Sequence, residues 1–324
     1  MNPDVAGAIA RLKAAGVLAD GPAAFFDRVA RRQLVSVRFE IRALLYAGVL
    51  LLTSGVGVLV AEHQQQIGPL AISAGIGLAS LACFAWVIRK ATPFSWGAVD
   101  SPNVAFDYVL LLGLLLLAAD LAYVEVQFTV LGPRWTYHLL LVAVVYLAAA
   151  YRWDSRTVLG LALSTLAAWR GISISLVHGA SSIDDPPLRV NAIVLGALYV
   201  GAAALSVRLG RKAHFKEVYA NAGLLLLLGA LVSGALDDWV AWPAWLLVLL
   251  IVAGLVVWLS LRLGRPLYFA EGVVAGYLGL VRLIFEPFQS SGASSIPLLL
   301  SALLGVGVLA VIATAYRRMR EREG

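Results

Sequence analysis

The chain has 324 residues, of which 61% are hydrophobic and only 14% are charged. The mean hydropathy of +0.87 lies far above that of soluble domains, so the sequence predicts an integral membrane protein. A single cysteine, Cys83, excludes an intramolecular disulfide, a thiolate metal site and a CxxC redox pair. The net charge of +6 does not indicate nucleic-acid binding, because the basic residues fall in short clusters between apolar runs.

Apolar runs long enough to cross a bilayer recur along the chain. A hydrocarbon core about 30 Å thick needs about 20 mostly apolar helical residues, which predicts an all-α, polytopic transmembrane bundle of about ten helices over residues 43–316. The runs are Ala43–Ala61, Pro69–Ile88, Val104–Val124, Trp135–Tyr151, Thr157–Val177, Leu188–Val207, Val218–Leu236, Ala241–Leu261, Pro266–Phe285 and Ile296–Tyr316.

The basic residues predict the orientation of these spans. Short cytoplasmic loops retain Lys and Arg, and alternate assignment of the loops leaves only Arg134, Arg170, Arg189 and Arg282 on the outer side. We therefore expect a multi-pass protein of the bacterial cytoplasmic membrane, with both termini and a basic tail of residues 317–324 in the cytoplasm. Tryptophans at the span boundaries fit interfacial anchors.

Residues 1–42 form a basic arm before the first span. Val5–Ala15 reads as a short helix ended by Gly16, and Asp20 with Pro22 opens a second helix that runs to Gln33. This pattern predicts a cytoplasmic helical hairpin. Its arginines lie close to the first span, so anionic lipid head groups are the expected partner, with a membrane protein as the alternative.

Standard catalytic and cofactor motifs are missing from the sequence. Gly305, Gly307 and Ala310 satisfy GxGxxA, but no strand precedes them, so they indicate helix packing, as does the GxxxG pair Gly272 and Gly276. The sequence holds no Walker A, HExxH or GxSxG motif. We therefore predict no cofactor, no metal and no catalytic residue from motifs.

Ionisable and polar residues inside the spans are the most informative feature, because each is costly in lipid unless it meets a partner or water. In the third span Asp120, Tyr123 and Gln127 share one helix face. In the ninth span Glu271 and Arg282 lie on one stripe, and Glu286 follows Arg282 by one turn. Together with Arg170 of the fifth span, these residues form a predicted polar seam: Asp120, Tyr123, Gln127, Arg170, Glu271, Arg282 and Glu286.

Depth counting suggests a partner within this seam. Asp120 and Arg282 lie equally far along their spans, which predicts an ion pair in the outer half of the bilayer with Arg170 near the same layer. The pair is either a structural lock between helices or part of a substrate or ion site.

Two further features leave alternatives open. Arg170 interrupts the fifth apolar run, so this span is either a broken helix with Arg170 at a cavity floor or a continuous helix whose Arg170 reaches outward. The outer acidic pairs, Asp184 with Asp185 and Asp237 with Asp238, are either solvated loop acids or weak ligands for a divalent cation.

Three stretches of the chain resemble a known family. They are RALLYAGVLLLTSGVGVLVAE at 42–62, YRWDSRTVLGLALSTLAAWRGIS at 151–173 and HFKEVYANAGLLLLLGALVSG at 214–234. They are similar to bacterial multi-pass membrane proteins grouped as domain of unknown function 2157. The resemblance implies a polytopic inner-membrane protein over most of the chain and brings no reaction or catalytic residue.

The polar seam is compatible with three functions. A small-solute or ion permease would use the seam as its pathway. A membrane scaffold, sensor or assembly factor would present the arm or a GxxxG face to another protein. An outer-leaflet enzyme acting on lipid or phosphate would need Arg170, Arg189 and Arg282 around one anion, with Asp120 or Glu125 as the base.

Overall fold

The computed structural model describes Leu12, Gly16 and residues 38–99, 101–178, 185–237, 241–288 and 295–323. The chain divides into two compact units, Met1–Gln66 and Ile67–Gly324. In the first unit Leu12 is helical and Gly16 has a φ of +70°, a left-handed conformation that commonly ends a helix. The other residues of the predicted hairpin lie outside the described residues.

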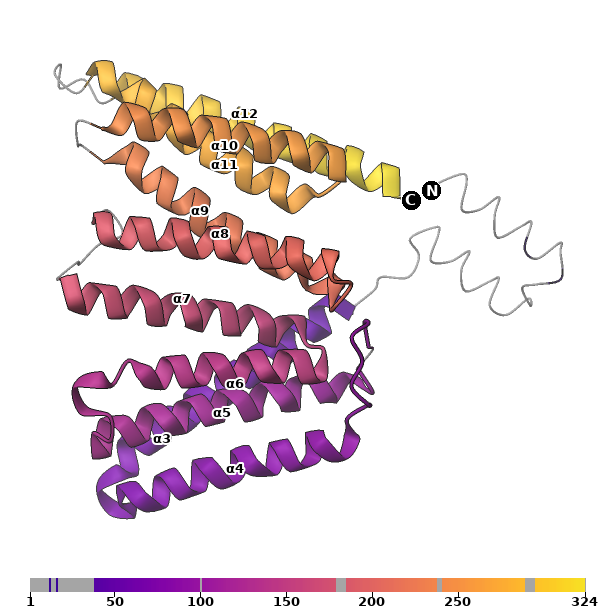
Figure 1. Ribbon diagram of the computed structural model, residues 1–324, viewed down its shortest axis with the longest axis vertical. Coiled ribbons are helices and arrows are strands. Elements are labelled where there is room, and N and C mark those ends of the chain that lie inside the picture. The colour runs from indigo at the N-terminus through magenta and orange to yellow at the C-terminus, as the bar shows by residue number, and fades with distance from the viewer. Residues whose placement is uncertain are drawn as a thin grey trace. The chain divides into compact units, whose positions relative to one another are not determined.

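The described residues are helical in long stretches joined by short turns (Figure 1). The first unit contributes α3 (Arg38–Ile67), whose last residue is at the unit boundary. The helices of the second unit are α4 (Pro69–Lys90), α5 (Val104–Phe128), α6 (Tyr137–Trp153), α7 (Arg156–His178), α8 (Pro186–Arg208), α9 (Lys216–Leu236), α10 (Trp242–Leu263), α11 (Pro266–Phe285) and α12 (Ser295–Glu323). Short 3-10 turns occur at Gly132–Arg134, Ala213–Phe215 and Glu286–Phe288.

Every predicted span falls on one of these helices, and no strand occurs among the described residues, so the all-α prediction is confirmed. Eight helices in this part of the chain are long and apolar enough to cross a membrane. The two that fall short are α3, with Ala43–Gly55 as its apolar stretch, and α6, with 17 residues. At about 1.5 Å per residue α6 is about 26 Å long, slightly less than a hydrocarbon core of about 30 Å. A count of ten spans therefore stays a prediction.

Local sequence explains where the helices start and stop. Proline lies in the first turn of α4, α8, α10 and α11, where its missing N–H costs no hydrogen bond. Asn103 caps α5 by accepting a hydrogen bond from Phe106 N at 2.9 Å. Gly264 ends α10 in the left-handed conformation, with a φ of +67°.

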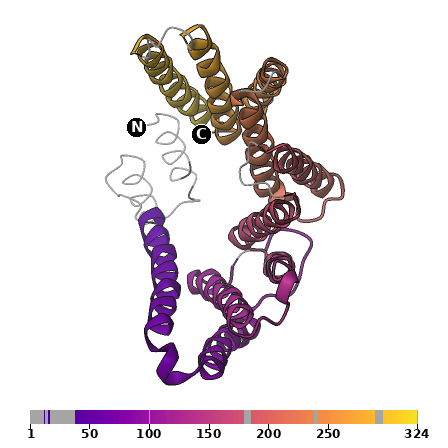
Figure 2. The ribbon, with the colours of Figure 1, turned by 90° about the vertical axis from the view of Figure 1, so that its left-hand side faces the viewer.

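The helices of Ile67–Gly324 pack mainly on their neighbours in the chain (Figures 1 and 2). The most extensive contacts join α4 to α5, α6 to α7, α8 to α9 and α10 to α11, and α12 packs on α11. Helix α9 also contacts α7, α10 and α11. Two residues at the same depth in the membrane are therefore far apart in the membrane plane when their helices are distant in the chain.

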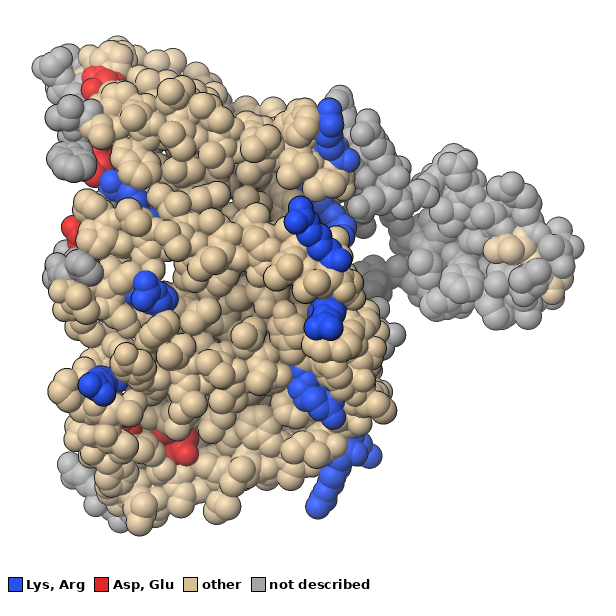
Figure 3. Space-filling model, viewed as in Figure 1, with Lys and Arg blue, Asp and Glu red and all other residues tan. Residues whose placement is uncertain are grey.

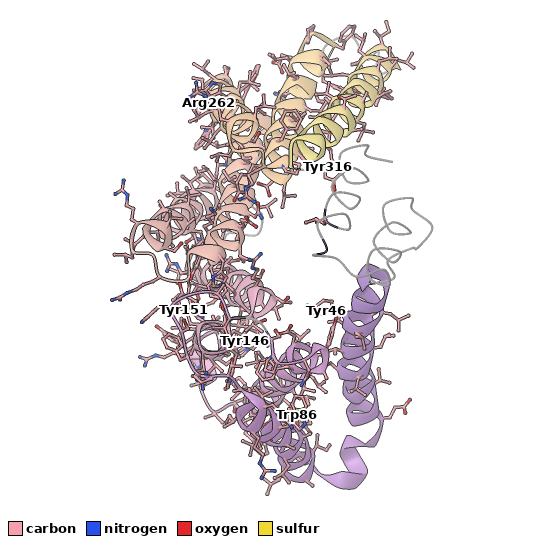
Figure 4. All side chains as sticks on the ribbon, turned by 90° about the vertical axis from the view of Figure 1, so that its right-hand side faces the viewer. Tyr46, Trp86, Tyr146, Tyr151, Arg262 and Tyr316 are labelled. Atoms are coloured by element: carbon pink, nitrogen blue, oxygen red, sulfur yellow. The ribbon has the colours of Figure 1, made fainter. Side chains whose placement is uncertain are left out.

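Two clusters of buried side chains hold this unit together, one spanning α4 to α9 and the other α9 to α11. Tyrosines anchor the first cluster (Figure 4): the Tyr146 hydroxyl donates to Leu114 O at 3.1 Å, and the hydroxyls of Tyr151 and Tyr219 lie 3.1 Å apart. Because α9 contributes to both clusters, it is the helix that joins them.

The outward faces of the helices are apolar. On α10 Leu247, Ile251, Leu255 and Leu259 recur at every fourth residue and are all exposed. In water such a stripe would be unfavourable, whereas in a bilayer it faces acyl chains.

Charged side chains separate toward the two ends of the helices. The last turns of α4, α6, α8 and α10 carry basic residues, and these helix ends lie on one side of the unit, called here the basic end. In Figure 3 Lys and Arg line this edge on the right, while the visible acidic side chains, together with some further Lys and Arg, lie toward the other edge. We call the other side the opposite end.

Candidate functional site

Asp120 of α5 faces α4. Its Oδ1 accepts a hydrogen bond from the Ser73 hydroxyl at 2.8 Å. Close approach is possible because Gly77 lacks a side chain: a Cβ there would lie 3.1 Å from Asp120 Oδ2. The predicted Asp120 to Arg282 ion pair is therefore wrong. The two residues share a depth, but α5 packs on α4 and α6 whereas α11 packs on α9, α10 and α12.

The other two seam residues of α5 lie nearer its end. The Tyr123 hydroxyl is buried without a hydrogen-bond partner among the described residues, and Gln127 is exposed. Glu125, the alternative base of the enzyme hypothesis, is buried and accepts a hydrogen bond from Leu131 N at 2.9 Å. Its carboxylate orders the turn after α5.

Arg282 lies at the opposite end of α11. Its Nη2 is 3.1 Å from Glu286 Oε2, one turn later, and its guanidinium lies 5.1 Å from the centre of the Trp242 ring. Arg282 is thus paired with Glu286 of the next turn and not with Asp120, the partner that was predicted for it. Trp242, predicted as an interfacial anchor, also covers this arginine.

Arg170 resolves the alternatives for the fifth span. Helix α7 runs without a break from Arg156 to His178, so the broken-helix alternative is wrong. The Arg170 side chain is exposed, lies 5.7 Å from the centre of the Trp169 ring and donates from Nε to Asn191 Oδ1 at 3.3 Å. A continuous helix is favoured because a long guanidinium side chain can reach the bilayer interface.

Arg189, which the enzyme hypothesis placed around an anion together with Arg170 and Arg282, is a buried arginine. It is 2% exposed, and its Nη2 lies 2.8 Å from Asp237 Oδ2. The guanidinium also lies 5.4 Å from the Trp245 ring centre and donates to the Ser233 hydroxyl at 3.4 Å. Asp237 therefore compensates a buried cation, and the alternative of a cation site at Asp237 is not favoured. Asp184 and Asp238 lie outside the described residues.

Arg170, Arg189 and Arg282 thus each have their own polar partner, Asn191, Asp237 and Glu286 respectively, although Arg189 and Arg282 both lie against tryptophans of α10. An anion-binding enzyme site needs such groups to converge on one point, so the structure does not favour the outer-leaflet enzyme.

A buried polar cluster at the basic end was not predicted. Asp154, at the turn after α6, is paired with Lys212 and His214 from the turn before α9. Lys212 Nζ lies 3.2 Å from Asp154 Oδ1, and the exposed fractions of the two side chains are 1% and 4%. His214 Nε2 contacts the same carboxylate oxygen.

The same cluster holds the loop between α4 and α5. Val99 N donates to Asp154 Oδ2 at 2.5 Å, and Lys212 N donates to Trp96 O at 2.8 Å. The Lys212 ammonium lies 5.4 Å from the Phe94 ring centre. We call Asp154, Lys212 and His214 the loop clamp. The sequence gives only a weak signal for the loop clamp, because charged residues between two apolar runs are usually exposed to solvent. In the structure both Asp154 and Lys212 adopt the left-handed backbone conformation of a turn.

Glu271 differs from all these groups. It lies on α11 about 8 Å from the helix start at the basic end, and its Oε2 is buried with no hydrogen-bond partner among the described residues. It lines a groove of about 380 Å³ between α9 and α11, whose other lining residues are Leu225, Leu228, Gly229, Val232, Ala270, Val274, Ala275 and Leu278. A carboxyl group thus faces an apolar groove inside a membrane span.

Apolar lipid-facing helices with charges at their ends define a multi-pass α-helical membrane protein. Residues 11–159 match the family model of DUF2157, a predicted membrane protein, so the resemblance expected from the sequence is confirmed there. The match includes Asp154 of the loop clamp, and the third similar stretch, at 214–234, lies beyond it. No curated protein and no solved structure matches the chain.

Proposed function

We propose that this protein is an ion permease of the bacterial cytoplasmic membrane and that Glu271 is its ion-binding group. The observation that carries the proposal is the Glu271 carboxyl, which faces an apolar groove with one oxygen unpartnered among the described residues. An ionised carboxylate in such surroundings costs several kcal/mol, so the group stays occupied by a proton or a small cation. Exchange of that ion between the two leaflets is the basic step of ion transport.

Of the ionisable residues in the predicted polar seam, Glu271 is the one on which the proposal depends. Asp120, Arg170, Arg282 and Glu286 have protein partners in the described part of the chain. Glu271 is the seam carboxyl that has neither a hydrogen bond nor an ion pair among the described residues, so it is the one that a mobile ion can neutralise.

Ion flux tests the role of Glu271. The full chain is reconstituted in vesicles that contain a pH-sensitive dye, and a membrane potential is imposed. We expect proton uptake several-fold above that of protein-free vesicles, and we expect Glu271→Gln to return it to background because the neutral amide neither takes up and releases a proton nor offers a negative charge to a cation. Glu62→Gln, at an exposed acid of α3, is the matched control and keeps the flux. Wild-type rates equal to protein-free vesicles for protons, sodium and potassium would contradict the proposal.

The orientation that we propose follows from the basic end, which the positive-inside rule places in the cytoplasm together with both termini. In a Cys83→Ser background, Ala98→Cys at the basic end and Val130→Cys at the opposite end put single exposed thiols on the two sides. A membrane-impermeant maleimide added to intact spheroplasts is expected to label Val130→Cys, and Ala98→Cys only after permeabilisation. The reverse pattern would place the basic end outside.

A scaffold or assembly factor is the second function that a specific observation favours. The helices pack mainly on chain neighbours, and α12 leaves Leu299, Leu303, Val306 and Leu309 exposed along its length. Such a face can receive a helix of another membrane protein. In the vesicle experiment above, this second function predicts no ion flux from a folded protein.

A further inference from the structure

A second groove opens at the basic end, between α8, α9 and α10. It has a volume of about 380 Å³, within the usual range of about 300–1,000 Å³ for small-molecule pockets. Its floor and walls are apolar, with Ala204 of α8, Ala220 of α9 and Val256 of α10 among them. Because these helices qualify as membrane spans, the apolar part of the groove lies at the depth of acyl chains.

Two cationic side chains and a phenol stand at the rim of this groove. Lys216 begins α9, Arg265 precedes α11, and Tyr268 lies in the first turn of α11. Lys216 is exposed, and no acid among the described residues lies within ion-pair distance of it. The groove therefore combines an apolar interior with a positive rim at one end.

The nearby acid does not cancel this positive charge. Glu217 Oε1 lies 2.5 Å from Arg265 Nη1, and Glu217 Oε2 lies 4.0 Å from Arg156 Nη1. One carboxylate is thus shared between two guanidiniums, and a guanidinium has five N–H donors, so Arg265 can hold Glu217 and a further oxygen ligand. The rim keeps a net positive charge with Lys216 included.

We propose that this groove is a binding site for an anionic phospholipid, whose phosphate lies between Lys216 and Arg265 and whose acyl chain follows the apolar walls. Other classes of ligand fit only one of the two parts of the groove, the positive rim or the apolar walls. A soluble anion would leave the apolar walls in contact with water, and a zwitterionic lipid would bring a cation toward Lys216 and Arg265. Basic pockets between helices at the cytoplasmic side have the chemistry for an anionic head group.

The test uses the delipidated full chain in detergent, with bound lipid measured by native mass spectrometry. The probes are phosphatidylglycerol, phosphatidylcholine and glycerol 3-phosphate. We expect phosphatidylglycerol to bind more tightly than phosphatidylcholine and glycerol 3-phosphate not to compete. Lys216→Gln should weaken phosphatidylglycerol binding about five-fold, the effect of about one basic residue.

Two further variants separate the rim from the walls. Arg262→Gln removes a charge at the same end outside the lining of the groove and is expected to leave binding unchanged. Ala204→Phe fills the apolar wall without changing charge and should weaken binding of both lipids. The thermal unfolding midpoint of each variant verifies its fold. Equal binding of the two lipids, competition by glycerol 3-phosphate, or equal effects of Lys216→Gln and Arg262→Gln would each overturn the proposal.

Discussion

Replacing Asp154 by asparagine is expected to lower the free energy of unfolding by about 3 kcal/mol, because it leaves the Lys212 ammonium buried without a counter-charge. The exposed fraction of Lys212 is 1%, so water cannot take over the role of the carboxylate. Asparagine retains a side-chain oxygen for Val99 N and tolerates the left-handed backbone at this position, where φ is +59°. The variant therefore isolates the loss of charge.

The measurement is thermal unfolding of the detergent-solubilised protein. A loss of about 3 kcal/mol corresponds to a fall of roughly 4–5 °C in the midpoint for a chain of this size. Arg156→Gln is the matched control at the same end: its ion pair with Glu217 spans 4.0 Å, and its side chain is 57% exposed. Pairs of that kind contribute about 0–1 kcal/mol.

A second variant identifies the cause. Adding Lys212→Gln to Asp154→Asn removes the unpaired cation, so the double variant should regain part of the stability lost in the single variant. Two results would show that the loop clamp does not work by charge compensation. One is an Asp154→Asn protein that unfolds at the wild-type temperature. The other is a double variant whose loss of stability equals the sum of the losses caused by Asp154→Asn and Lys212→Gln alone.

The positions of the helices could be predicted from sequence because the thickness of the bilayer fixes their length. Residues 266–285 were expected as one span and form α11 with the same bounds. Proline in the first turn marks its start, as it does for α4. Charge clusters likewise indicated which helix ends share a side, as the basic end shows.

The sideways arrangement could not be predicted in the same way. Counting residues along a span gives depth alone, so Asp120 and Arg282 looked like partners although their helices have different neighbours. The loop clamp was missed for a related reason. Their hydropathy places Asp154 and Lys212 in loops between spans, and they become buried only because the turn after α6, the turn before α9 and the loop between α4 and α5 pack together. Both failures concern contacts between segments that are far apart in the chain.

The contact between α8 and α9 gives the second large effect. Gly196→Ala is expected to lower the free energy of unfolding by about 2–3 kcal/mol, because there is no room for a methyl group. A Cβ at Gly196 would lie 2.7 Å from Gly223 O and 2.9 Å from Leu227 N. Both atoms belong to the backbone of α9, so a rotamer change cannot relieve the clash and the two helices must move apart.

The sign of this effect separates packing from helix propensity. Alanine is favoured over glycine within a helix by about 1 kcal/mol, so propensity alone would make Gly196→Ala stabilising. Gly201→Ala, on the same helix with nothing within 4 Å of its Cβ position, is the matched control and should be neutral or stabilising. A thermal unfolding midpoint that is lower for Gly196→Ala than for wild type, together with one that is not lower for Gly201→Ala, would establish the close backbone contact between α8 and α9.

The reciprocal glycine completes the argument. A Cβ at Gly223 would lie 2.7 Å from Gly196 O and 2.9 Å from Val200 N, so Gly223→Ala should destabilise for the same reason. Once one alanine has pushed the helices apart, the second meets less resistance, and the double variant should cost less than the sum of the single variants. Strict additivity, or a Gly196→Ala protein as stable as wild type, would mean that α8 and α9 are not held at backbone contact, and the joining of the two buried clusters through α9 would need another explanation.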